Sequence, residues 1–376
     1  MSIPAASNSE KAPQKDNYQP PSCLSSLPDD VVLNCLSRVP RCDDLNISCV
    51  SKTLRSLVRS PELCLLRSHL PKKSVYLFYH SHQEPNRCHW ITLRPGEKIT
   101  TTYDYQVEVE HRSCSLSDLL NPPYLSTFSS SAVSVGSEIY FPQGCFSPST
   151  NLWVLDTRSG AIRMGPSMKV ARWAHKEAMG VVDGKIYVIG GSVEKCQVEV
   201  FDPKSQTWEF AGEDKVKHES RFSASLEDKI YMVELYPERI SAYSPREGIS
   251  IEVTERLTDQ MNCMCVVENV IYACFKRSGL MWFDTKLKVW RRLVDSNGKV
   301  TLYSLIAEKM GEFEGKLAVF WTRSINTDGV VKKDIRCRMI ALDRVGEEIR
   351  GKIVRSGIVA SFAYPITLSH CLAVSD

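Results

Sequence analysis

The densest group of side chains that could bind a metal lies in one short segment, at His80, His82, Cys88 and His89. A closed zinc site needs about four ligands converging on one point. His80 and His82 would share one face of a strand, but the adjacent Cys88 and His89 would point to opposite faces. We therefore predict no metal site in this segment.

Cys263 and Cys265 also share one face of an expected strand, with no third or fourth ligand in sight. Packing as small hydrophobic side chains is the favoured interpretation of this pair. The chain has no phosphate-binding Gly-Lys-Ser/Thr loop, no GxGxxG and no GxSxG nucleophile turn. We predict no catalytic residue and no cofactor; an enzyme is an alternative that a metal analysis of the protein would test.

An arginine followed by a large aromatic residue occurs twice, as Arg172-Trp173 and Arg221-Phe222. These residue types dominate the binding energy of protein interfaces, so Arg172, Trp173, Arg221 and Phe222 are candidates for a surface that binds a protein. The alternative is that the aromatic rings pack inside the fold while the arginines are solvated. We favour burial for the rings and leave both interpretations open for the arginines.

The elements that would position these residues form a repeat. From Ser74 onward an expected strand recurs every 41 to 47 residues, at Ile139-Tyr140, Ile186-Tyr187, Ile230-Tyr231, Ile271-Tyr272 and Leu317-Ala318. A polar turn precedes each strand, and a second strand follows that usually ends at an aspartate, as in Phe201-Asp202-Pro203 and Phe283-Asp284. The pattern therefore predicts four strands in each unit, and four such strands form one blade of a β-propeller.

Five full units span about residues 126–356, and a partial unit precedes them at 75–93. Alternation of polar and apolar residues over 103–109 predicts the outermost strand of that first blade, and 111–131 then reads as a long connection. The first blade lacks an inner strand, which the C-terminal segment could supply from 359–364 or 372–374. Such pairing would remove two exposed sheet edges, so we predict six blades sealed by the C-terminal segment.

A small helical region precedes the repeat. Val32, Leu33, Leu36 and Val39 recur at helical spacing, and the following Pro40 ends that helix. A unit of this size rarely forms a sufficient core of its own, so its surplus of apolar residues needs a partner, either the rest of the chain or another protein. Residues 1–22 are polar and are expected to be disordered.

Both regions resemble a known family. The helical region resembles the F-box of the plant F-box/kelch-repeat family at Leu27-Pro28-Asp29-Asp30-Val31, Leu36-x-Arg38-Val39-Pro40, Cys49-Val50-Ser51-Lys52-x-x-Arg55-x-Leu57 and Ser60-Pro61-Glu62-Leu63. The repeats resemble kelch repeats, most clearly over 183–191 with Phe201-Asp202-Pro203 and Trp208. The resemblance implies a mainly β fold, with an F-box helical domain over 23–70 and a kelch-type propeller over 74–376.

The family resemblance also implies partners. An F-box docks on a Skp-type adaptor and through it on a cullin ubiquitin ligase, while the propeller binds a protein substrate for ubiquitination. Nine residues are expected to divide between the F-box core and the adaptor contact: Leu27, Pro28, Val32, Leu36, Val39, Leu45, Val50, Leu54 and Leu57. Many F-boxes carry an aromatic residue at the position of Leu54, so adaptor preference is expected to differ. The alternative is a kelch scaffold that acts outside the ligase.

Composition limits the remaining possibilities. The formal net charge is +3 with scattered basic residues, which gives no electrostatic footprint for nucleic acid. No apolar run approaches the roughly 20 residues that span a bilayer, and the N-terminus has no secretory signal. Fourteen cysteines without such a signal predict free thiols in a reducing compartment, hence a soluble cytoplasmic or nuclear protein.

Overall fold

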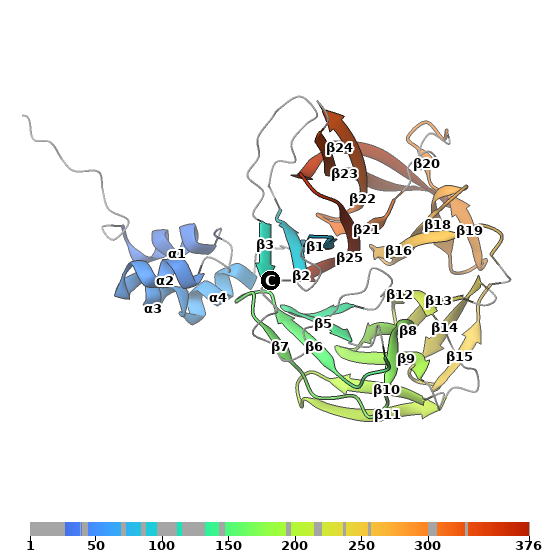
Figure 1. Cartoon of the computed structure of the whole chain (residues 1–376), viewed down its shortest axis with the longest axis horizontal. Helices are drawn as coiled ribbons and strands as arrows, with labels where there is room; N and C mark the ends of the chain where they lie inside the picture. Colours follow the sequence, from blue (N-terminus) through green and yellow to red (C-terminus); the bar gives the residue numbers. More distant parts are fainter. Residues whose placement is uncertain are drawn as a thin grey trace, which may run out of the picture. The chain divides into compact units, whose positions relative to one another are not determined.

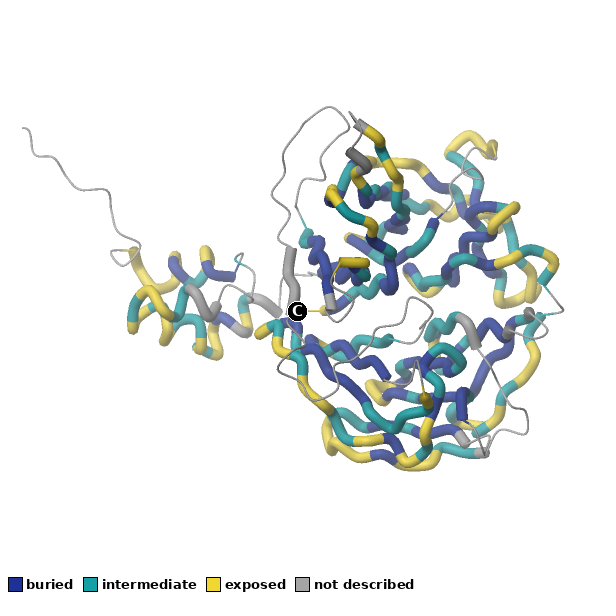
Figure 2. Tube along the Cα trace, in the orientation of Figure 1, coloured by how far each residue is buried: buried dark blue, intermediate teal, exposed yellow. Residues whose placement is uncertain are grey.

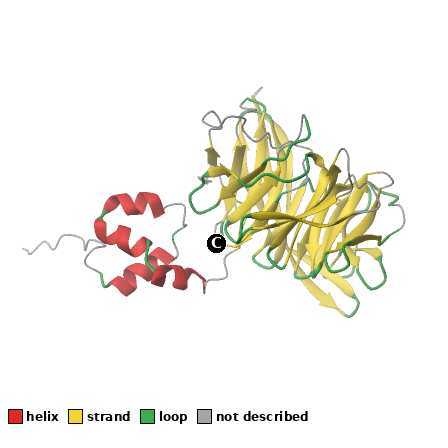
Figure 3. Cartoon of the chain, turned by 90° about the horizontal axis from the view of Figure 1, so that it is seen from below, coloured by secondary structure: helices red, strands yellow, loops and turns green. Residues whose placement is uncertain are grey.

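The computed structural model of the chain describes residues 27–37, 39, 44–68, 73–83, 88–95, 111–114, 132–142, 147–192, 197–213, 220–235, 238–254, 257–299, 307–327 and 330–375. The chain divides into two compact units, Met1–Leu70 and Pro71–Asp376. Helices occur in the first unit and strands in the second (Figure 3). The expected disordered tail, 1–22, lies outside the described residues.

The first unit contains α1 (Asp29–Ser37), α2 (Asp44–Val50), α3 (Lys52–Val58) and α4 (Pro61–Ser68). Local capping defines where two of these helices begin. The Ser51 hydroxyl accepts a hydrogen bond from the Leu54 backbone N–H at 3.1 Å, and the Ser60 hydroxyl accepts one from Leu63 at 3.2 Å. Such bonds satisfy backbone donors that a helix start leaves unpaired. Among the described helices, none is long and apolar enough to cross a membrane.

The second unit is a six-bladed propeller (Figure 1). Each blade is an antiparallel sheet of four strands, to which the short β20 adds a parallel edge strand in blade 6. From the innermost strand outward the blades are: blade 1, β25 (Ile366–Ser375), β1 (Lys73–Ser81), β2 (Cys88–Leu93), β3 (His111–Cys114); blade 2, β4 (Val133–Val135), β5 (Glu138–Pro142), β6 (Leu152–Asp156), β7 (Ile162–Met164); blade 3, β8 (Arg172–Val182), β9 (Lys185–Ser192), β10 (Gln197–Asp202), β11 (Thr207–Glu213); blade 4, β12 (Ser220–Leu226), β13 (Lys229–Leu235), β14 (Glu238–Ser244), β15 (Ile249–Glu252); blade 5, β16 (Met261–Val267), β17 (Val270–Phe275), β18 (Gly279–Asp284), β19 (Val289–Arg292); and blade 6, β21 (Lys309–Phe313), β22 (Lys316–Thr327), β23 (Val330–Val345), β24 (Glu348–Phe362), with β20 (Val294–Asp295) beside β24.

Apolar clusters join every pair of neighbouring blades, including blades 6 and 1. In the cluster between blades 6 and 1, Leu77 and Ile91 pack with Phe320 and Ile335, all fully buried. Because the hydrophobic effect acts at all six interfaces, the ring is closed by packing and not only by hydrogen bonds. The buried core of the propeller is therefore distributed between the blades.

The aspartate that ends the third strand of several blades forms a side-chain turn. Asp156, Asp202 and Asp284 each accept a hydrogen bond from the backbone N–H two residues further on, at 2.9, 2.8 and 3.1 Å. These turns lead the chain into the outermost strand. The backbone hydrogen bond from Lys204 is the main cause that lowers the pKa of Asp202. The repeated aspartate in the sequence is thus a turn-forming residue.

The repeat predicted from the sequence is confirmed, and the C-terminal segment does complete blade 1. Its inner strand is β25, so the alternative at 372–374 is right, while 359–362 belongs to β24. The outer strand of blade 1 is β3 at His111–Cys114, so the start of the expected connection over 111–131 is a strand. The expected strand at 103–109 lies outside the described residues.

Candidate functional site

The core of the helical unit takes up several of the predicted adaptor residues. Val32 and Leu36 on α1 are buried with Leu63 on α4. Leu54 and Leu57 on α3 are partly buried against the same cluster. These four predicted residues therefore stabilise the helical unit, and the aliphatic side chain at position 54 fills its core.

Other apolar residues of the helical unit are exposed; Figure 2 colours exposed residues along the backbone yellow. Leu27 is 38% and Val50 is 74% exposed, and Pro28, which follows Leu27, is exposed as well. Val31 and Leu65, at 39% and 62%, were missed by the sequence reasoning. Val31 on α1 and Leu65 on α4 do not lie on the buried faces of these helices. Their positions outside the apolar periodicity of each helix could have indicated their exposure. Val39 is half-buried, and the side chain of Leu45 lies outside the described residues.

One rim of the propeller carries the predicted substrate-face residues. Arg172 pairs with Ser192 at the end of β9, and Phe222 pairs with Val233 near the end of β13. The first residues of an inner strand therefore lie beside the last residues of the second strand of the same blade. We name the rim of the propeller at which these residues lie the loop rim. Residues 173–176 have no paired partner on β9, so they form a bulge at this rim.

The aromatic residues at the loop rim are only half-buried. The Trp173 ring meets the His175 ring edge-on, with centroids 5.5 Å apart. Phe222 packs against the cluster that contains Val233 and Met261. Part of each ring remains accessible. The side chain of Arg221 lies outside the described residues.

Arg172 is a correction to the prediction of a substrate-contacting arginine. Its side chain and that of Glu199 are both completely buried, and the guanidinium Nη2 lies 3.0 Å from Glu199 Oε2. The guanidinium also donates to the Gly190 carbonyl, while the Glu199 carboxylate accepts from the backbone N–H of Lys169 at 2.6 Å. A buried charge is stable only with such partners. Arg172 therefore holds blade 3 together and is not available to a partner.

A second buried carboxylate, Glu177, shares this environment. Gly191 lies at φ +68°, and a Cβ atom there would come within 2.9 Å of the Glu177 Cβ. Gly191, the second glycine of the Gly190-Gly191 pair, thus allows β9 to approach Glu177 closely. Burial, together with the nearby Glu199 carboxylate and against the attraction of Arg172, raises the pKa of Glu177 to about 8.

This pKa predicts how stability depends on pH. The carboxyl of Glu177 binds its proton more tightly in the folded protein than in the unfolded chain. Its pKa is 4.5 in the unfolded chain and about 8 in the folded protein. The contribution of Glu177 to the stability of the folded protein is therefore complete at pH values below the unfolded pKa. It is lost as pH rises through the folded pKa. We expect the urea midpoint of the propeller to fall across that window, and Glu177→Gln to flatten the fall. If the urea midpoint of Glu177→Gln falls with pH as steeply as that of the unmodified protein, the raised pKa of Glu177 is not the cause of the fall.

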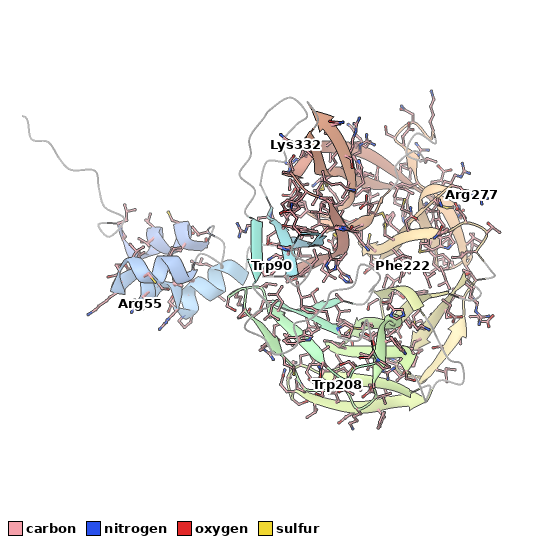
Figure 4. The ribbon with its side chains drawn as sticks, in the orientation of Figure 1. Arg55, Trp90, Trp208, Phe222, Arg277 and Lys332 are labelled. Carbon is pink, nitrogen blue, oxygen red and sulfur yellow. The ribbon has the colours of Figure 1, made fainter. Side chains whose placement is uncertain are left out.

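Blade 6 differs from the others in length. β22 and β23 contain 12 and 16 residues. They remain paired as far as Thr327 and Val330, well beyond Phe320 of β22, which pairs with Lys309 at the start of the inner strand. The hairpin therefore projects at the loop rim. Its exposed residues include Arg323 and Lys332, and Lys332 is labelled in Figure 4. We name residues 321–335 the blade 6 arm.

The thiols described in the propeller serve packing. Cys263 is buried between blades 5 and 6, and Cys265 is partly buried against the same cluster. Burial raises the pKa of both thiols well above the ordinary range. The prediction that this pair packs as small hydrophobic side chains is confirmed. Across the described part of the chain, no group of three or more His, Cys, Asp or Glu side chains is arranged to hold a metal.

Comparison with known proteins agrees with both units. The family model described as F-box domain matches residues 24–66, and the one described as FKB95, Kelch-repeats domain matches 90–360. The Arabidopsis thaliana F-box/kelch-repeat protein At2g41360 is 41% identical over 94% of this chain and 98% of its own length. At2g44630, of the same type and organism, is 37% identical over 98% of this chain and 100% of its own.

Among solved structures, YjhT aligns over 61% of this chain and 93% of its own length, with a TM-score of 0.40 and 10% identity. That similarity is too low to inform the fold. The two family models and the long alignments with the Arabidopsis proteins agree with the helical unit and the six blades described above. The chain belongs to the F-box/kelch-repeat family.

Proposed function

We propose that this protein is the substrate-recognition subunit of a Skp-cullin-F-box ubiquitin ligase. The pairing of an F-box with kelch repeats supports a substrate-adaptor role in general. The observation that carries the proposal is the apolar surface of the helical unit. That unit has a core of its own and still exposes Leu27, Val31, Val50 and Leu65. Exposed apolar side chains of this kind favour a protein partner, here a Skp-type adaptor.

The target protein would bind at the loop rim. Trp173 and Phe222 offer half-buried aromatic rings there, and the blade 6 arm offers Arg323, Lys332 and Lys333. Aromatic and arginine side chains are the residues that most often dominate interface energy. The charges of the arm favour a target segment that carries acidic residues. The protein itself would perform no covalent chemistry; it would raise the concentration of the target near the transfer machinery.

The adaptor contact is tested by changing exposed residues only. We expect the triple variant Leu27→Ala, Pro28→Ala, Val50→Glu to lose adaptor binding by at least about tenfold, because it removes apolar contact area and buries an unpaired charge at the interface. The measurement is a pull-down of purified Skp-type adaptor and cullin by the full-length chain, followed by titration of the adaptor.

The matched control is Leu287→Ala with Val289→Ala, which changes two exposed apolar residues of the propeller. This control should bind the adaptor as the unmodified chain does. Circular dichroism should show the same helix content in both variants. Full adaptor binding by the triple variant would refute the contact, and adaptor binding without cullin would favour a scaffold outside the ligase.

A further inference from the structure

In the blade 6 arm, β22 has an unpaired inner edge. β21 pairs with β22 only between Phe320 and Lys316 of β22, whereas β22 continues to Thr327 and stays paired with β23 on its other side. Among the described residues, no strand pairs with the inner edge of β22 from Trp321 to Thr327. Such an edge offers backbone donors and acceptors to a further strand.

Two hydrogen bonds at the base of the arm define which backbone groups lie on this edge. The Glu308 N–H donates to the Phe320 carbonyl at 2.9 Å, and the Thr322 N–H donates to the Glu308 carboxylate at 2.9 Å. Glu308 directly precedes β21, so the backbone groups of Phe320 and Thr322 point to the inner side. Because these groups alternate sides along a strand, those of Ser324 and Asn326 point to the same edge.

The Glu308 carboxylate takes the place of an inner strand at one position only. It accepts hydrogen bonds from the Thr322 N–H and, at 2.6 Å, from the Thr322 hydroxyl. No described residue takes that place for Ser324 and Asn326. A row of alternating N–H and C=O groups is complementary to an extended peptide, which carries the same groups at the same spacing.

The charges of the arm select the kind of peptide. Arg323 and Lys332 are exposed and flank Ile325, which pairs with Lys332. Neither cation has an ion pair among the described residues. Asp334, opposite Arg323, is buried and accepts a hydrogen bond from the Ser361 hydroxyl at 2.7 Å. The face therefore presents positive charge to a neighbouring strand.

This charge also disfavours a second copy of the protein on the same edge. Pairing of two β22 edges would bring the cations of both arms together, and like charges on adjacent strands are destabilising. Charged side chains on an edge protect it against such self-association. An acidic strand is attracted by the same cations, so charge complementarity favours an acidic partner.

We propose that the inner edge of β22 binds an extended acidic segment of the target protein as an additional antiparallel strand. The segment would continue the line of β21 and pair with the backbone of Ser324 and Asn326. Every second side chain would be a carboxylate on the face of Arg323 and Lys332. This inference rests on the proposed function and specifies its substrate class, a protein recognised through a strand with alternating acidic residues.

The probe is a fluorescein-labelled peptide of about ten residues in which glutamate and threonine alternate. It is titrated with the full-length chain and followed by fluorescence anisotropy, and we expect a Kd of about 100 µM or tighter. A control peptide with lysine in place of glutamate should bind at least about tenfold more weakly.

Two N-methylated forms of the acidic peptide test the backbone pairing. With the glutamates beside Arg323 in an antiparallel pair, the threonine N–H groups face β22 and the glutamate N–H groups face away. Methylation of the threonine amides should therefore weaken binding at least about tenfold, because it removes the donors to the edge. Methylation of the glutamate amides should change the Kd by less than about threefold.

Two variants of the arm test the same edge from the protein side. Ser324→Pro removes the inward N–H but no bond of the β22–β23 ladder, so the melting temperature should stay the same while binding weakens at least about tenfold. Arg323→Glu should weaken the acidic peptide about tenfold or more and strengthen the lysine peptide. Lys286→Glu, an exposed charge reversal in the turn after β18, should leave both peptides unchanged.

The proposal is overturned if the acidic peptide does not bind at about 0.5 mM protein or if the acidic and lysine peptides bind equally. Equal binding of the two N-methylated forms would also overturn it, as would normal binding by both Ser324→Pro and Arg323→Glu. The adaptor is absent from this experiment, so its failure would leave the adaptor contact untouched.

Discussion

Arg172→Met is expected to lower the free energy of unfolding of the propeller by about 3–5 kcal/mol, because it leaves the buried Glu199 carboxylate without its cation. The Gly190 carbonyl would lose its donor as well. Such a loss is a large part of the roughly 5–15 kcal/mol that stabilises a typical domain. All seven tryptophans lie in the propeller, so urea unfolding followed by tryptophan fluorescence measures this unit selectively.

The matched control for this variant is Arg163→Met. Arg163 forms an ion pair with Glu138 at 2.6 Å, but its side chain is 45% exposed. An exposed pair of this kind contributes about 1 kcal/mol or less. Adding Glu199→Gln to Arg172→Met should recover part of the loss, since no buried charge then remains uncompensated. Equal effects of Arg172→Met and Arg163→Met would show that burial of the pair does not matter.

Deleting residues 366–376 is expected to prevent the propeller from folding to a stable monomer. The deletion removes β25, which pairs with β1 from Lys73 to Ser81, and with it the buried side chains of Ile366, Leu368 and Val374. The edges of β1 and of the ring would be exposed, and unpaired edges promote aggregation. We expect the truncated protein to be insoluble or to elute as an aggregate in size-exclusion chromatography.

A single substitution tests the same strand more gently. Leu368→Ala should cost about 2–5 kcal/mol because Leu368 packs between blades 6 and 1. Deletion of residues 1–22 is the control for truncation as such and should leave the melting temperature of the propeller unchanged. A truncated chain without β25 that elutes as a monomer and melts like the full-length protein would show that the C-terminal strand is dispensable.

Much of the fold could be predicted from the sequence because the repeated residues have local roles. Asp202 and Asp284 form turns with backbone groups two residues away. Two-residue turns such as Glu268-Asn269 place both residues at positive φ, which is how tight hairpins turn. Local constraints of this kind recur in several blades, so they produce a period that can be recognised in the sequence.

The candidate surfaces were harder to predict because they depend on contacts that are distant in sequence. An arginine next to a tryptophan is typical of an interface, and only the structure shows Arg172 sealed against Glu199, 27 residues later. The bulge at Ser369 in β25 arises because the residues on either side of it pair with Phe78 and Tyr79, which lie almost 300 residues earlier in the sequence. Leu54 packs in the helical core and Val50 lies on the surface. This difference depends on how the helices pack against one another.

The pairing of Lys73 with Ser375 sets the order of events during synthesis of the protein. Blade 1 begins to emerge from the ribosome first, but it lacks its inner strand until the strands of the other five blades have been synthesised. Blade 1 can therefore be completed only after β25 has emerged, whereas each later blade contains its own inner strand. A message truncated before the codons of β25 would consequently yield a product that displays an open β1 edge, which chaperones and proteases can recognise.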